Sequence, residues 1–133
     1  MNAPTVIPVT NAAGAVAIAV GLGLTVYTHS IDLSNLDTFA LSYSVACTGV
    51  PNMKIEMEQS IVLPTTEGAA DGNWVVPETI ADVDAALIVK TVKIAALFPV
   101  CTRYIRFKIT DVAAAVADNV FTMNLSAQNR FIQ

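Results

Sequence analysis

Apolar and polar residues alternate with a period of two along much of the chain, which is the pattern of half-buried β-strands. The clearest runs are 39–45, 53–61 and 103–110, and further extended segments are expected at 15–20, 24–31, 73–76, 86–95 and 120–127. Turn residues, mainly Gly, Pro, Asn and Asp, separate these runs. The pattern therefore predicts an all-β fold: an antiparallel β-sandwich or jelly roll of about seven or eight strands.

Two short segments compete with this assignment because their composition also suits a helix. They are 80–87 and the alanine-rich stretch 111–117. For the second we expect a long apolar loop between two strands. No internal repeat or domain boundary interrupts the 133 residues, a length that favours one domain.

Two of the alternating runs carry charges of opposite sign on one face. The charges are the acids Glu56 and Glu58 in one run and the bases Arg106 and Lys108 in the other. Both pairs have the same two-residue spacing, so paired antiparallel strands would place them opposite one another. We predict solvent-facing cross-strand ion pairs, with Ile55 and Met57 facing inward.

The same charges have two other interpretations. Glu56 and Glu58 are a candidate acid/base pair for a small hydrolase, but carboxylates two positions apart in a strand point the same way, and glycosidases need them on opposite sides of the bond. Arg103, Arg106 and Lys108 are a candidate nucleic-acid patch. The net charge of −4 opposes that, because nucleic-acid binding requires a basic face.

The N-terminal segment has no charged side chain before Asp32. Its apolar run 12–26 is shorter than a spanning helix and lacks the preceding basic residues of a signal peptide, so we expect neither. We predict that 1–22 is an N-terminal arm or first strand and that 23–133 is a single β-sandwich domain. Such an arm can pair with the sheet edge of a neighbour, so its candidate interface residues are Val16, Ile18 and Val20.

The composition is poor in charge: 14% of residues are charged and 54% are hydrophobic. An average soluble domain has about 25% charged residues. A chain with so few charges leaves apolar surface exposed, which usually marks contact with another molecule. We therefore expect an assembled protein, and a large core of small residues is the alternative.

The longest irregular region, 62–84, contains the only tryptophan and five of the eleven acids. Trp74 is a candidate interface anchor, a candidate sugar-stacking platform, or a core residue at the start of a strand. Asp71, Asp82 and Asp84 could bind a metal, but they lack the spacing of a calcium loop, and a solvated acidic loop is the expectation. No metal or cofactor is predicted.

Residues with nucleophilic chemistry are few and scattered. Cys47, Cys101 and His29 belong to no zinc or catalytic motif. They are expected to be packing residues, and a Cys47–Cys101 disulfide remains open. The sequence indicates no enzyme.

Four segments in order, IDLSNLDTFALSYS, KIEMEQS, EGAADGNWVVPE and LFPVCTRYIRFKITD, resemble small β-sandwich virion proteins of tailed phages over about residues 30–128. The resemblance implies a capsid decoration or cement protein, or a small head–tail component, located in the virion. Its implied partners are itself, as a dimer or trimer, and major capsid or other virion proteins, without nucleic acid or membrane. The alternative is a carbohydrate-binding or adhesion module that uses Trp74.

Overall fold

The computed structural model describes residues 5–76, 82–88, 93–94, 98–99, 102–112 and 117–129. Within these ranges the chain forms strands, turns and loops. They contain no helix long and apolar enough to cross a membrane.

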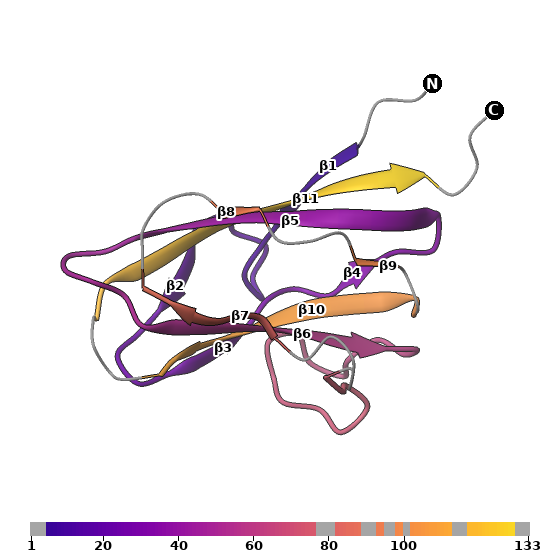
Figure 1. The fold of residues 1–133 in the computed structure, drawn as a ribbon. Helices are drawn as coiled ribbons and strands as arrows, with labels where there is room; N and C mark the ends of the chain where they lie inside the picture. Colours follow the sequence, from indigo (N-terminus) through magenta and orange to yellow (C-terminus); the bar gives the residue numbers. More distant parts are fainter. Residues whose placement is uncertain are drawn as a thin grey trace.

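The described residues form eleven strands in two antiparallel sheets that pack face to face (Figure 1). Sheet A contains β1 (Thr5–Val9), β2 (Ile18–Val20), β11 (Asn119–Asn129), β5 (Leu36–Ala46), β8 (Lys93–Ile94) and β9 (Phe98–Pro99). Sheet B contains β3 (Thr25–Tyr27), β4 (Ile31–Asp32), β10 (Tyr104–Asp111), β6 (Met53–Ser60) and β7 (Asp82–Leu87).

The strand order is that of a jelly roll. β1 and β2 both pair with β11, β3 and β4 with β10, and β8 and β9 with β5, so the eleven segments occupy 11 − 3 = 8 strand positions. Numbered along the chain, these positions run 1-8-3-6 across sheet A and 2-7-4-5 across sheet B. The chain is thus a long hairpin rolled into two sheets. The predicted all-β antiparallel fold is confirmed.

The core lies between the sheets and follows the predicted period. Phe39, Leu41, Tyr43 and Val45 of β5 are all buried, as are Ile105, Phe107 and Ile109 of β10. Met53, Ile55 and Met57 of β6 and Phe121, Met123 and Leu125 of β11 complete the layer. Side chains of a strand alternate between its faces, so one face of each sheet supplies this core.

Several predicted boundaries differ from the structure. Residues 82–87 form strand β7 against β6, so the helical alternative for 80–87 is wrong over this part: edge pairing overrides a weak helix preference. The expected strand 73–76 is reduced to one bridge between Val75 and Gln59. Residues 113–116 of the expected apolar loop lie outside the described residues.

The N-terminal segment is part of sheet A. β1 pairs with the second half of β11 and β2 with its first half. Val9, Ile18 and Val20 are fully buried in the core. Over residues 5–20 the segment therefore serves as the first strand position of its own chain.

Candidate functional site

The oppositely charged residues of β6 and β10 meet in the predicted register. Arg106 lies opposite Glu58, and Lys108 lies opposite Glu56. Arg106 Nε donates a hydrogen bond to Glu58 Oε1 at 2.8 Å. Glu56 instead has an ion pair with Lys54 of its own strand, at 3.5 Å between Nζ and Oε2. Of these two facing pairs, Arg106 and Glu58 therefore form a direct ion pair between the strands.

The expectation that these pairs face solvent is wrong at Arg106 and Glu58. Arg106 is 0% exposed and Glu58 is 8% exposed. The connection that follows β6, residues 61–76, lies against the outer face of sheet B and contacts Arg106 through Ala69 and Trp74; we call it the covering loop. Period two correctly predicts which face a side chain occupies, but not what lies over that face.

Arg106 is enclosed by aromatic rings as well as by polar groups. Its guanidinium carbon lies 4.3 Å from the ring centre of Tyr27 in β3 and 4.7 Å from that of Trp74 in the covering loop. Its Nη1 donates to the carbonyl oxygen of Ala69 at 2.8 Å. A desolvated cation between two ring faces gains a cation–π attraction from each.

Trp74 is buried next to a short strand bridge, which agrees in part with its interpretation as a core residue at the start of a strand, but its place differs from the one expected. It is 5% exposed, but it lies on the outer face of sheet B and is not part of the core between the sheets. Its ring stacks on Arg106, so it is not an open platform for a sugar in this conformation. Its burial also means that it is not an exposed interface anchor.

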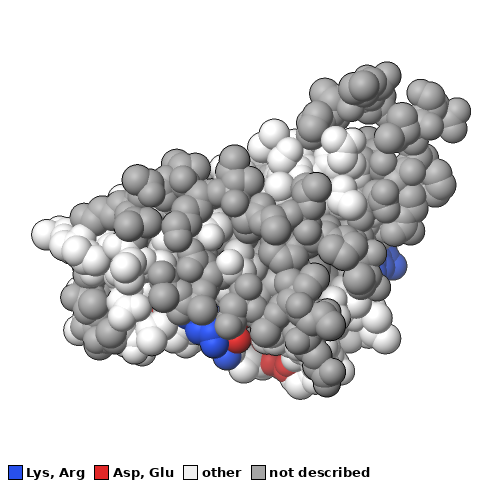
Figure 2. All heavy atoms as spheres, in the orientation of Figure 1, with Lys and Arg blue, Asp and Glu red and all other residues white. Residues whose placement is uncertain are grey.

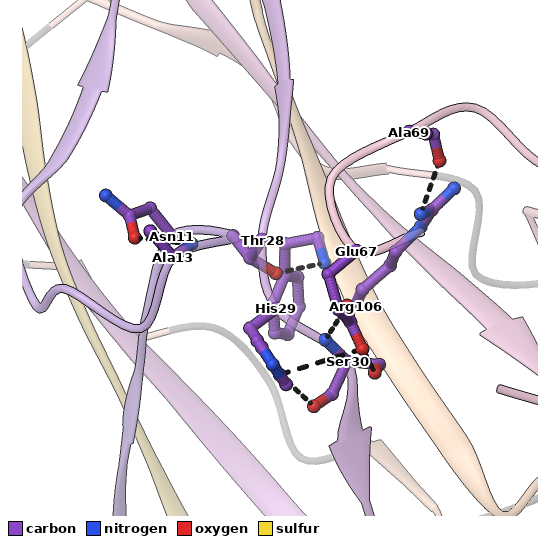
Figure 3. A network of polar contacts seen from close by, with 9 residues as sticks. Asn11, Ala13, Thr28, His29, Ser30, Glu67, Ala69 and Arg106 are labelled. Atoms are coloured by element: carbon purple, nitrogen blue, oxygen red, sulfur yellow. Dashed lines mark hydrogen bonds and ion pairs between the residues drawn. The ribbon is translucent and has the colours of Figure 1, made fainter. Parts of the chain in front are cut away.

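Hydrogen bonds near Glu67 fasten the covering loop to the turn between β3 and β4 (Figure 3). The Glu67 carboxylate accepts from the Ser30 backbone N at 3.0 Å and from the Ser30 hydroxyl. His29 Nδ1 lies 3.8 Å from Glu67 Oε1 and 3.0 Å from the Ser30 carbonyl oxygen. The serine hydroxyl is thus bonded to the carboxylate and not to the imidazole, so Ser30 and His29 do not form a serine–histidine pair.

Two buried donors in this cluster lack an acceptor among the described residues: Arg106 Nη2 and Trp74 Nε1. An unpaired buried donor costs about 1–3 kcal/mol. The Glu58 carboxylate is largely buried and already paired with Arg106, so little of it is free to meet a substrate. The arrangement is best suited to holding the covering loop against sheet B.

A second charged pair, between Asp32 of β4 and Arg103 just before β10, is exposed. Arg103 Nη2 lies 3.3 Å from Asp32 Oδ2. Hydrogen bonds from the Ser34 side chain and backbone, together with Arg103, hold the pKa of Asp32 below its usual value, while partial burial opposes this. Asp32 in turn raises the pKa of Arg103. An exposed pair of this kind contributes little to stability.

The candidate interface residues of the N-terminal segment separate into two groups. Ile18 and Val20 are buried in the core of their own chain, so their prediction as surface residues has to be corrected: they occupy the inward positions of β2. Val16 lies before β2 and is half-exposed. Only Val16 is therefore available to another molecule in this conformation.

The acidic candidates do not assemble into a site among the residues described. Asp71 Oδ1 accepts a hydrogen bond from the Asn73 backbone N at 2.9 Å, which shapes the turn before Trp74. The side chains of Asp82 and Asp84 lie outside the described set. Within that set, no group of three His, Cys, Asp or Glu residues is placed to hold a metal ion.

The possible Cys47–Cys101 disulfide also lies outside the described residues, because Cys101 is not among them. Cys47 Sγ lies 3.6 Å from the Gly49 carbonyl oxygen at the end of β5.

The sequence did not single out Tyr27 and Ala69, which contact Arg106, or Glu67, which is bonded to Ser30. Tyr27 is one apolar position in an extended segment, and Glu67 is one acid of an irregular region. Neither has a local pattern that singles it out. Their contacts with residues of β10 and the β3–β4 turn join segments far apart in the chain.

The chain was compared with known proteins. No protein-family model matches it, and no curated protein matches it.

Proposed function

We propose that the protein is a non-enzymatic virion structural protein, acting as a capsid decoration or cement protein that stabilises a phage head lattice. The observation that carries the proposal is the jelly-roll strand order. Viral capsid proteins use this architecture, as do lectins and cupins. One fold hosts many functions, so the choice among them depends on the surface and the site.

The surface and the site favour a structural role over the alternatives. Only 14% of residues are charged, and eleven large apolar side chains are exposed within the described residues. Such a surface suits lasting contact with other protein. The best-formed polar cluster, around Arg106, is closed and occupied by its own loop.

The test is binding to capsids assembled from the coat protein of the same genome. Purified protein is added in increasing amounts and co-sedimentation is measured. The proposal expects saturation at a fixed number of copies per coat subunit and greater resistance of the particles to heat. Absence of saturable binding contradicts it.

A glycan array separates this role from the carbohydrate-binding alternative. Because Trp74 is covered, the proposal expects no glycan binding by the wild-type chain or by Trp74→Ala. Specific binding that disappears in Trp74→Ala would support the adhesion module and count against the virion role.

A further inference from the structure

The jelly-roll order gathers several loops at one end of the sandwich. Val20 pairs with Asn119, Thr25 with Thr110, and Met53 with both Asp111 and Leu87. The β2–β3, β5–β6 and β10–β11 connections and the chain leaving β7 therefore meet there. We call this end, formed by 21–24, 47–52, 88, 112 and 117–118, the loop end; it lies at the left in Figure 1.

The loop end exposes large apolar side chains from every one of these connections. Each is between 53% and 66% exposed, and together they are five of the eleven exposed large apolar residues described: Leu22, Leu24, Val50, Ile88 and Val112. Connecting loops ordinarily turn polar groups to water. Apolar side chains gathered from separate loops indicate a contact surface.

The polar groups of the loop end bond to one another instead. Asp111 Oδ2 accepts from the Gly23 backbone N at 2.9 Å, and the Asp111 N donates to the Leu24 carbonyl oxygen at 3.0 Å. The Val112 N donates to the Asn52 carbonyl oxygen at 2.9 Å. These bonds hold the apolar side chains on a fixed frame, so less ordering is needed when a partner binds.

Charge is distributed unevenly between the two ends. Among the described loop-end residues the exposed charge is Asp118, whose carboxylate accepts hydrogen bonds from Thr48 N and Oγ1 at 2.7–3.0 Å. The opposite end carries Glu67 and the exposed Arg103–Asp32 pair. The charges that Figure 2 shows on this face lie along the lower edge and at the right.

We propose that the loop end binds the loop end of a second copy of this chain. Each copy has a net charge of −4. Among the described residues the loop end exposes a single charge, Asp118, which is bonded to Thr48, so joining two such ends brings few like charges together. A two-fold contact requires such a self-complementary patch. A specific contact of this kind has to bury at least roughly 1,000 Å² in total.

A lipid surface is the less suitable occupant. Anionic membranes attract clusters of Lys and Arg, and the described loop-end residues include neither. The inference rests on the proposed function in one respect, that the chain works as an assembly. The contact between copies is thus assigned to the loop end and not to the N-terminal segment, which was the candidate from the sequence.

The experiment is sedimentation velocity on the wild-type chain and two matched double variants. Leu22→Lys with Val50→Lys places charges in the proposed contact, and Ile61→Lys with Leu63→Lys makes the same change at exposed positions of the opposite end. We expect a wild-type dimer at micromolar concentration, a dissociation constant at least ~100-fold higher in the loop-end variant, and no change in the control. Circular dichroism verifies folding, and Leu22→Ser provides a milder loop-end variant.

A monomeric wild-type chain, a dimer that survives the loop-end changes, or equal dissociation of the control overturns the inference. So does binding of the monomer to phosphatidylserine vesicles that is lost in the loop-end variant. Capsid binding is measured in parallel. A monomer that binds capsids removes this inference and leaves the proposed function, whereas a dimer that ignores capsids does the reverse.

Discussion

Arg106 shows how a charged residue is accommodated without any exposed surface. Glu58 supplies the opposite charge, Ala69 an acceptor, and Tyr27 and Trp74 two ring faces. Desolvation of both charges offsets much of their attraction, so the pair need not be a large net source of stability. What it does provide is a specific position for the covering loop.

Replacing Arg106 alone is expected to be severe. In Arg106→Met the Glu58 carboxylate is left buried without its partner, which typically costs about 3–5 kcal/mol. The free energy of unfolding, measured by urea denaturation, is expected to fall by that amount. Adding Glu58→Leu to Arg106→Met should restore part of the loss, because an apolar pair leaves no buried charge.

The control is Arg103→Met, which removes an arginine from the exposed pair with Asp32, just before the start of β10. We expect little change in its unfolding free energy. Equal losses in the Arg103 and Arg106 variants would contradict the structural role of the buried pair.

At the scale of elements, the covering loop behaves as a third layer over the outer face of sheet B. It is attached through Glu67 to Ser30, through Ala69 and Trp74 to Arg106, and through Val75 to Gln59. Long irregular connections usually have a functional or structural reason. Here the reason is structural: the covering loop buries Arg106, whose side chain lies on the outer face of sheet B.

At Gly68 the covering loop lies close to Ala12 of the β1–β2 connection. The φ of Gly68 is +82°, and a Cβ there would lie 2.5 Å from the Cβ of Ala12. Gly68→Ala is therefore expected to cost at least about 1–2 kcal/mol through its backbone conformation alone, and to loosen the loop. Hydrogen exchange and limited proteolysis between residues 61 and 76 measure the loosening.

Gly72 is the matched control within the same loop. A Cβ at that position meets no atom within 4 Å, and its φ is outside the left-handed region. Gly72→Ala should leave exchange and proteolysis nearly unchanged. If both alanines loosen the loop equally, the close approach at Gly68 is not what holds it.

At the scale of the whole molecule, the N-terminal segment closes the sandwich. β1 and β2 cover the edge of β11 and bring Val9, Ile18 and Val20 into the core. Losing one large buried aliphatic side chain typically costs 2–5 kcal/mol. Losing three, with their strands, would approach the entire stability of a domain, about 5–15 kcal/mol.

Deletion of residues 1–20 is therefore expected to prevent folding, as measured by circular dichroism and gel filtration. Val6→Lys, which changes an exposed side chain of β1, is the control and should retain the fold. A deletion variant that keeps the wild-type melting temperature would return the segment to the role of an arm.

How much of this follows from the sequence can be judged from particular residues. The alternation through Phe39, Leu41 and Tyr43 correctly predicts both a strand and its buried face, because side chains of a strand point alternately to its two sides. The equal spacing of Glu56, Glu58, Arg106 and Lys108 correctly predicts the pairing of β6 with β10. These are properties of local geometry and of one neighbouring strand.

By itself, then, the sequence determined the all-β class, the inward faces of the main strands and the register of one charged pair. Only the tertiary structure decided that Arg106 and Glu58 are buried, that Ile18 and Val20 belong to the core, and that apolar loop residues share one end. Period two specifies a face but not its covering. What covers a face, and which loops meet, depend on the order in which the strands roll together, and that order is set by contacts between distant segments.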